Sequence, residues 1–218
     1  MEKGKAVRGL NVDLVVSAAM ELADESGLGA VTMAAVAKRC GFTTMSLYRH
    51  VSGKDELVRR MLEAALGIAP PLETTDWREG LMRWSRAMLE ILDRHPWGID
   101  VPISGMLGTT AQLSWLDRGL EALASTGLDE AAKAELVLLV NGYVFWAARL
   151  RFQVPDDETI QVVPPGFDLS AFPSLSRAMA AGIFEDDETT RDEDFTFGLE
   201  RGLDGISVLI DRGRDEGA

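Results

Sequence analysis

Hydroxyl, guanidinium and ammonium groups gather between residues 43 and 54 of the chain. They belong to Thr43, Thr44, Ser46, Tyr48, Arg49 and Lys54. Hydroxyl and guanidinium groups form hydrogen bonds with the base edges and phosphates of nucleic acids, and a lysine ammonium binds phosphate as a point charge. This stretch therefore offers the chemistry of nucleic-acid recognition.

Side chains that commonly catalyse reactions are few in comparison. The chain has two histidines, His50 and His95, and a single cysteine, Cys40. It has no glycine-rich sequence that would cradle a phosphate and no ligand spacing typical of a metal site. The sequence therefore predicts a protein that is not an enzyme and that needs neither a metal nor a cofactor.

The same residues bear on the compartment. A lone cysteine cannot close an intrachain disulfide, and the N-terminal residues lack the pattern of a secretory signal. The longest apolar run, Leu136–Leu150, contains Asn141 and Arg149 and is shorter than the roughly 18 residues that a membrane span needs. We therefore expect a cytoplasmic protein with no membrane span, and we interpret the apolar run as a buried helix.

Two short helices joined by a glycine turn are predicted to position the polar residues. Thr32 is placed to cap the first helix, and Gly41 is placed to end it. Thr43 or Thr44 then caps a second helix that runs through His50. This layout matches a helix-turn-helix, whose second short helix enters the major groove of duplex DNA. On spacing alone, the alternative is an ordinary helical hairpin whose polar face is only solvated.

Longer helices are predicted on both sides of this pair. Apolar residues repeat at helical spacing over Leu14–Ala23 and form the preceding helix. Ser52 with Asp55 forms a capping box that starts a fourth helix, which two prolines after residue 69 interrupt. We therefore place a helix-turn-helix domain at residues 1–66 and a second domain at residues 67–218.

The second domain is also predicted to be helical. Asp76 and Asp129 are placed to cap two of its helices. The segments 153–173 and 185–194 are rich in proline or acidic residues and are interpreted as loops. Apolar stripes at helical spacing lie at residues 81–91, 113–123, 129–152 and 195–210. The sequence therefore predicts an all-α fold, with a three-helix N-terminal helix-turn-helix domain joined to a C-terminal helical bundle.

Charge is distributed unevenly between the two domains. The whole chain carries a net charge of -13. Residues 1–60 contain nine Lys or Arg against seven Asp or Glu, a balance of +2, which leaves -15 for residues 61–218. A locally basic head can dock on phosphates while an acidic body disfavours indiscriminate binding to nucleic acid. The alternative is that the acidic surface simply aids solubility.

The residue types between positions 31 and 57 narrow the interpretation further. The stretches Val31–Phe42, Met45–Val51 and Lys54–Leu57 strongly resemble the TetR family of bacterial transcriptional regulators, and the match extends over Asp13–Leu66. A looser resemblance to the tetracycline-repressor-type ligand-binding body continues through Arg94–Trp97 and into the glycine-rich last helix. The resemblance implies a regulator, most simply a repressor, that binds a double-stranded DNA operator.

Position by position, the resemblance assigns residues to the DNA. It puts Thr44, Met45, Ser46 and Tyr48 at the DNA surface and Thr32, His50 and Lys54 near the phosphates, with Thr43 and Arg49 as further candidates. A lysine at the start of a helix is a simple phosphate clamp, which agrees with the assignment of Lys54. For His50, the alternative is that it ends its helix as a C-cap.

Large side chains in the second domain indicate a pocket for a small apolar or amphipathic effector. Ligand sites are mostly apolar and hold a few polar groups. The candidates are Trp84, Met88, Trp97, Met106, Trp115, Asn141, Phe145, Trp146 and Arg149. For any single aromatic residue, the alternative is that it belongs to the core. The resemblance favours a pocket among them, whose occupation would change the separation of two DNA-binding heads.

Three glycines, Gly198, Gly202 and Gly205, lie inside the predicted last helix, where each costs roughly 1 kcal/mol relative to alanine unless packing compensates. Close approach of another helix is the expected compensation. This resembles the family's dimerising four-helix bundle, so we expect a homodimer through helices 129–152 and 191–213. Two-fold symmetry then predicts a near-palindromic operator with half-sites about 34–36 Å apart, or a multiple of that spacing.

Two other classes of function compete with this interpretation. A helical adaptor or ligand-binding protein without operator binding would use the same bundle but not the polar face. An activator would bind operator DNA with the opposite effect on transcription. Salt-dependent binding to duplex DNA separates the first class from a regulator.

Overall fold

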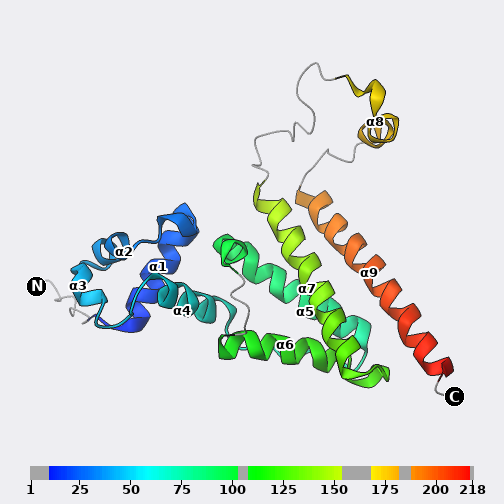
Figure 1. Ribbon diagram of the computed structural model, residues 1–218, viewed down its shortest axis with the longest axis horizontal. Helices are drawn as coiled ribbons and strands as arrows, with labels where there is room; N and C mark the ends of the chain where they lie inside the picture. Colours follow the sequence, from blue (N-terminus) through cyan, green and yellow to red (C-terminus); the bar gives the residue numbers. More distant parts are fainter. Residues whose placement is uncertain (1–9, 103–107, 154–167, 182–187, 217–218) are drawn as a thin grey trace, which may run out of the picture. The chain divides into compact units, whose positions relative to one another are not determined.

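The computed structural model describes residues 10–102, 108–153, 168–181 and 188–216. Every regular element in these residues is a helix (Figure 1), which confirms the all-α prediction. Contacts divide the chain into two compact units, Met1–Val137 and Leu138–Ala218, and each is described by itself. The division into domains after residue 66 stays a prediction.

Four α-helices form the N-terminal part of the first unit, which we call the head (residues 11–66). They are α1 Val12–Ser26, α2 Met33–Cys40, α3 Thr44–Leu47 and α4 Lys54–Leu66, with a 3-10 turn, η1 Leu28–Ala30, between α1 and α2. Local hydrogen bonds set the helix starts: Asn11 Oδ1 accepts from the Leu14 N–H at 2.8 Å, and Thr32 Oγ1 accepts from the Ala35 N–H at 3.2 Å.

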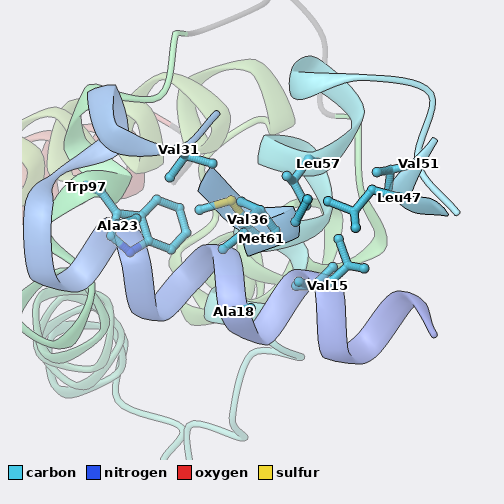
Figure 2. Close-up of a cluster of buried hydrophobic side chains, with 13 residues drawn as sticks. Val15, Ala18, Ala23, Val31, Val36, Leu47, Val51, Leu57, Met61 and Trp97 are labelled. Carbon is cyan, nitrogen blue, oxygen red and sulfur yellow. The ribbon is translucent and has the colours of Figure 1, made fainter. Parts of the chain in front are cut away.

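A close-packed apolar cluster holds the head helices together. Val15 and Ala19 of α1, Val36 of α2, and Leu57 of α4 are fully buried, and Leu47 anchors α3 in the same cluster (Figure 2). Burial of a side chain of this size contributes roughly 1.5–3 kcal/mol. Each head helix therefore depends on the others for its position.

Gly41 provides the turn between α2 and α3. Its φ of 76° and ψ of 26° lie in the left-handed region, and its N–H donates to the carbonyls of Ala37 and Lys38. Glycine adopts this conformation without steric cost, so α2 ends there and α3 starts two residues later. The predicted caps of both helices and this turn are confirmed, with Thr43 rather than Thr44 as the cap of α3.

Two predictions for the head are wrong in detail. The α-helical part of α3 ends at Leu47 rather than His50, and tight turns continue the chain to His50. The cap of α4 is shifted by one residue, because Gly53 takes the N-cap position and Glu56, not Asp55, reaches back to Ser52. Both differences leave the polar residues on the same short segment.

The remaining helices of the first unit follow after a linker. They are α5 Trp77–Arg94, η2 Pro96–Asp100, α6 Thr110–Ala122 and η3 Ala124–Thr126, followed by the start of α7 Glu130–Gln153. Asp76 caps α5 and Asp129 caps α7, as predicted. Met106 lies outside the described residues.

The buried face of α6 differs from the predicted leucine stripe. Ala111, Trp115, Gly119 and Ala122 are buried, whereas Leu113 is exposed. A Cβ on Gly119 would lie only 2.8 Å from Val137 Cγ1 of α7, so α6 packs closely through its small residues. Of the predicted stripe, Leu123 at the end of the helix is fully buried, whereas Leu116 and Leu120 are only half-buried.

The long apolar helix α7 is buried on one face only. Val137, Val140, Val144 and Ala148 are buried, and they follow one another at helical spacing. Leu138, Leu139, Trp146 and Leu150 are exposed on other faces. By length and composition alone, Glu130–Phe152 is long and apolar enough to cross a membrane, with a mean hydropathy of 1.2. The prediction of a buried helix is therefore right for one face and wrong for the rest.

The second unit pairs the C-terminal part of α7 with α9 Glu188–Glu216 (Figure 1). The rings of Tyr143 and Phe195 stack at 5.6 Å, and the Tyr143 hydroxyl donates to Phe195 O at 3.0 Å. Arg151 also forms an ion pair with Asp192. The expected loop at 185–194 is wrong from residue 188 onward, because acidic residues are favourable at a helix N-terminus.

A short helix, α8 Pro173–Ala180, and a 3-10 turn, η4 Leu169–Ala171, were not predicted from the sequence. Proline at the first helical position is common, because that position leaves the backbone N–H unpaired in any case. The proline that was interpreted as the end of a loop therefore begins a helix.

Candidate nucleic-acid interface and ligand site

The outer face of α3 is exposed, whereas its inner face is buried in the head. Met45 is 75% exposed and Tyr48 is 49% exposed, while Leu47 is fully buried between them. A helix anchored by one apolar residue and offering its other side chains to the outside has the geometry of a recognition helix. Met45 gains nothing from the head core, and it can contact a thymine methyl group.

Thr43 and Ser46 are tied to each other at the start of α3. Thr43 Oγ1 accepts from the Ser46 N–H at 3.3 Å and lies 2.9 Å from Ser46 Oγ. The Thr43 oxygen therefore has a structural role as the cap. Of the predicted DNA contacts on this segment, Met45, Tyr48 and Arg49 are the exposed ones beyond the cap, and Thr44 is half-buried.

Lys54, one of the predicted phosphate contacts, binds the turn η1 that precedes Thr32, another of them. Thr32 caps the N-terminus of α2, and Lys54 begins α4. Lys54 Nζ donates to Leu28 O at 3.4 Å, so the ammonium lies at the turn that leads into α2. A lysine beside the N-terminal end of a helix offers an anion both charge and a helix dipole.

A single carboxylate holds the turn between α3 and α4. Glu56 Oε2 accepts from the Ser52 N–H at 2.7 Å and the Ser52 hydroxyl at 2.6 Å, and Arg60 donates to Oε1 at 2.8 Å. These hydrogen bonds, those from Ser52 first, lower the pKa of Glu56 to about 2. The start of α4, and with it Lys54, is thereby fixed.

His50 lies at the end of the same turn, and its side chain is half-buried. Its backbone N–H donates to Leu47 O at 2.8 Å, which closes the turn after α3. The backbone of His50 therefore closes the turn whether its side chain caps the helix or contacts phosphate. Its contact with phosphate stays a prediction.

Three of the predicted effector residues lie together between α5 and α6. Trp84 and Trp115 meet edge to face at 6.2 Å, Trp84 Nε1 donates to Trp115 O at 2.9 Å, and Met88 is buried one turn further along α5. A surface hollow of about 210 Å³, part of it open to solvent, is lined by both tryptophans. The part of this hollow that water-sized atoms could occupy is about 30 Å³, far below the roughly 300 Å³ at which ligand pockets begin.

Trp97 lies elsewhere, in the core of the head. It is 2% exposed and belongs to the apolar cluster of α1, α2 and α4 (Figure 2). Its indole Nε1 donates to Asp24 Oδ1 at 2.7 Å. This position gives the side chain a packing role in the head.

The other predicted effector residues that the structure describes belong to α7. Trp146 is 59% exposed, and Asn141, Phe145 and Arg149 are half-buried. Their contact with a ligand stays a prediction.

Sequence reasoning missed several residues that link helices. Asp24 binds His95 and Trp97, which lie 71 and 73 positions further along the chain. Glu63 of α4 accepts from the Ala111 N–H of α6 at 3.2 Å. Ser85 of α5 is fully buried, and its hydroxyl has no partner among the described residues. No local spacing reveals such residues, because their partners are far away in the sequence.

Known proteins share both halves of this arrangement. The family model "Bacterial regulatory proteins, tetR family" matches residues 15–61, and the model "Tetracyclin repressor-like, C-terminal domain" matches residues 69–210. The HTH-type transcriptional repressor DrrR1 of Streptomyces coeruleorubidus is 32% identical over 96% of this chain and 82% of its own length.

Solved structures show the same fold. Apo ActR from Streptomyces coelicolor superimposes with a TM-score of 0.77 at 24% identity, covering 97% of this chain and 99% of its own. ActR in complex with actinorhodin gives a TM-score of 0.76 at 23% identity, covering 93% and 99%. With the matches to both family models and to DrrR1, the chain belongs to the TetR family of DNA-binding transcriptional regulators.

Proposed function

We propose that this regulator is a homodimeric repressor that binds a near-palindromic operator and is released by a small apolar or amphipathic effector. Residues 1–66 form the DNA-binding domain, and residues 67–218 form the effector-binding and dimerisation domain. The observation that carries the proposal is the surface of α3, where Met45 and Tyr48 are exposed on either side of the buried Leu47. A short helix that is anchored by one buried residue and offers two large side chains to the outside fits the major groove of duplex DNA.

The DNA contacts divide into readout and anchoring. Thr44, Met45, Ser46 and Tyr48 contact base edges, and Arg49 and Thr43 contribute from the same segment. The anchoring residues are Thr32, His50 and Lys54. Lys54 beside the N-terminus of α2 supports this division, because phosphate contacts orient a protein on DNA without reading its sequence.

The dimer forms through α7 and α9. Leu138, Leu139 and Leu150 of α7 are exposed, as are Phe197 and Val208 of α9. A Cβ on Gly202 or Gly205 would meet no atom of the described residues within 4 Å, which leaves room for a helix of a second copy. A dimer would cover these apolar side chains and place two heads on one duplex.

The effector binds among the large side chains of the second domain. Trp84, Met88 and Trp115 are the candidates best supported, because the two tryptophan rings meet edge to face and Met88 is buried one turn further along α5. Asn141, Phe145, Trp146 and Arg149 of α7, together with Met106, stay candidates from the sequence. The complex of ActR with actinorhodin supports the proposal that this fold accommodates a small molecule.

The relatives are named as regulators or repressors, and we propose that this chain likewise catalyses no reaction and acts in the cytoplasm without a metal or cofactor. Among the described residues, no three His, Cys, Asp or Glu side chains are placed to hold a metal ion. A ligand returned unchanged after incubation with the protein would support a sensor.

Operator binding is tested with duplexes selected from a random pool by the full chain, using fluorescence anisotropy over a range of salt concentrations. Affinity is expected to fall steeply as salt rises. Lys54→Ala removes one phosphate contact per head and is expected to reduce the slope of log affinity against log salt by about 0.9 per contact. Tyr48→Ala is expected to weaken binding by about 1–3 kcal/mol.

The matched control is Lys38→Ala. Lys38 is an exposed lysine in the last turn of α2, at the opposite end from Thr32. Its loss changes the charge of the head by the same amount as the loss of Lys54 but removes no proposed contact. Equal effects of Lys38→Ala and Lys54→Ala would contradict the assignment. A chain that selects no duplex would support the adaptor instead, and a reporter that falls silent on deletion of the gene would indicate an activator.

A further inference from the structure

A carboxylate at the end of α1 joins the head to the segment that follows α5. Asp24 Oδ1 lies 2.9 Å from His95 Nδ1 and accepts from Trp97 Nε1 at 2.7 Å. The two rings lie 5.8 Å apart. One oxygen atom thus holds both donors of a segment more than 70 positions away in the sequence.

Burial makes this joint stiffer than a surface contact. Trp97 is 2% exposed and packs with Ala23, Val31 and Met61 in the head cluster (Figure 2). A residue from beyond α5 therefore completes the core of the head. Interiors packed in this way transmit displacement, because they leave little free volume.

The same segment is continuous with α5. The His95 N–H donates to Ile91 O at 2.9 Å, and the Gly98 N–H donates to His95 O at 2.9 Å. Met88, a candidate effector contact, lies about two helical turns before His95. A displacement at the C-terminal end of α5 is thus carried directly to Trp97.

A second link runs from α4 to α6. The Ala111 N–H donates to Glu63, the Ala69 N–H donates to Ser114 Oγ at 3.0 Å, and Trp115 Nε1 donates to Leu66 O at 3.2 Å. The head is thus held at α4 by α6 and at α1 by η2. Two separate attachments define the orientation of a rigid body better than one.

We propose that Asp24 is a positioning residue that couples the orientation of the head to the end of α5, with His95 and Trp97 as its partners. This inference rests on the proposed function, because it assigns to Asp24 the transmission between effector and operator. Asp24 is not among the residues proposed to contact DNA or effector. It acts by making the position of α1 depend on η2.

Thermodynamic reciprocity gives a test that needs no known effector. If η2 biases the head, then operator that fixes the head must equally bias η2. Local opening of η2 is reported by exchange of its backbone hydrogens with deuterium. A selected operator duplex is therefore the probe, and peptides covering residues 95–101 are the readout in the full chain.

At saturating duplex, wild-type protein is expected to exchange these hydrogens about fivefold or more slowly than free protein, the lower end of typical coupling. Asp24→Ala is expected to abolish this response while still binding duplex at saturation. Glu25→Ala is the control, because Glu25 pairs with Arg39 inside the head and not with η2. It is expected to retain the response. His95→Phe keeps a ring beside Trp97, removes one donor, and reports the same step if Asp24→Ala does not fold.

The outcomes separate the two proposals. Wild-type protein that binds no duplex contradicts the proposed function. Wild-type protein that binds duplex without slowing exchange at residues 95–101 overturns the coupling, as does an undiminished response in Asp24→Ala or a response lost equally in Glu25→Ala. Loss of the response in Asp24→Ala and its retention in Glu25→Ala support the coupling, since a general loss of head stability would weaken the response in both variants.

Discussion

At the scale of single residues, Glu56 shows how one side chain positions several others. Its carboxylate accepts from the backbone and hydroxyl of Ser52 and pairs with Arg60. The sequence predicted Asp55 in this role. Because Gly53 rather than Ser52 takes the N-cap position, the third residue of α4 is Glu56, and Glu56 makes the contact instead. The ionised form of Glu56 is therefore the one that the folded head favours, which makes the turn before α4 sensitive to acid.

Glu56→Gln tests this role through pH. A carboxyl whose pKa is lowered in the folded state stabilises the protein above its unfolded value, and this contribution disappears as the pH falls through the folded value. The melting temperature of wild type is expected to exceed that of Glu56→Gln at neutral pH. The gap is expected to narrow between about pH 4.5 and about pH 2. Asp55→Asn serves as the control for charge removal in this turn, and a gap that does not change with pH would contradict the assignment.

At the scale of elements, the glycines of α9 divide into two kinds. A Cβ on Gly198 would overlap the Tyr143 hydroxyl and lie 2.8 Å from Tyr143 Cζ. Gly198 is thus needed for the contact between α7 and α9, which agrees with the prediction that another helix approaches these glycines closely. A Cβ on Gly202 meets nothing within 4 Å in the described residues, so packing inside one chain does not account for it.

Alanine substitutions are expected to separate these glycines. Gly198→Ala should destabilise the protein by about 1–3 kcal/mol, because the added methyl group displaces Tyr143. Its combination with Tyr143→Ala should lose much less than the sum of the two single changes. Gly202→Ala should stabilise α9 by roughly 0.5–1 kcal/mol if nothing packs against residue 202. If the same substitution destabilises the dimer, a second copy packs against Gly202. Chemical denaturation at several protein concentrations measures these effects.

Contacts within about four residues were predictable from the sequence, and distant ones were not. Thr32, Gly41 and Asp76 act on backbone groups close to them, so their patterns identified helix ends. The buried face of α6 depends on how closely Gly119 and Ala122 approach other helices, which composition does not reveal. The inward position of Leu47 and the polar outer face of α3 followed from the spacing, and the place of Met45 on that face followed from the resemblance. The partners of Asp24 required the fold.

At the scale of the whole molecule, the proposed dimer accounts for exposed apolar residues that one chain does not cover. Exposed leucines on α7 accompany Phe197 on α9, where Arg201 lies 5.1 Å above the ring. Reading two half-sites requires two heads, so operator affinity and assembly are linked. In this proposal the acidic body contributes to the link by keeping a single head from binding phosphate indiscriminately.

Leu139→Glu is expected to shift the protein from dimer to monomer in sedimentation experiments, because a buried and unpaired charge is costly. Affinity for the palindromic duplex should fall, while affinity for a single half-site should stay the same. Leu113→Glu places the same charge on an exposed leucine of α6, outside the proposed interface, and should remain dimeric. Monomers of both variants, or of neither, would contradict the proposed interface.

The exposure of Met45 has a consequence for how such regulators diversify. Because its side chain contributes nothing to the head core, we expect its replacement to change the preferred DNA without a penalty in folding. Leu47, two residues away, allows no such freedom. Operator preference can therefore evolve, or be engineered, by exchanging a few outward side chains of α3 while the scaffold and its response to the effector are inherited unchanged.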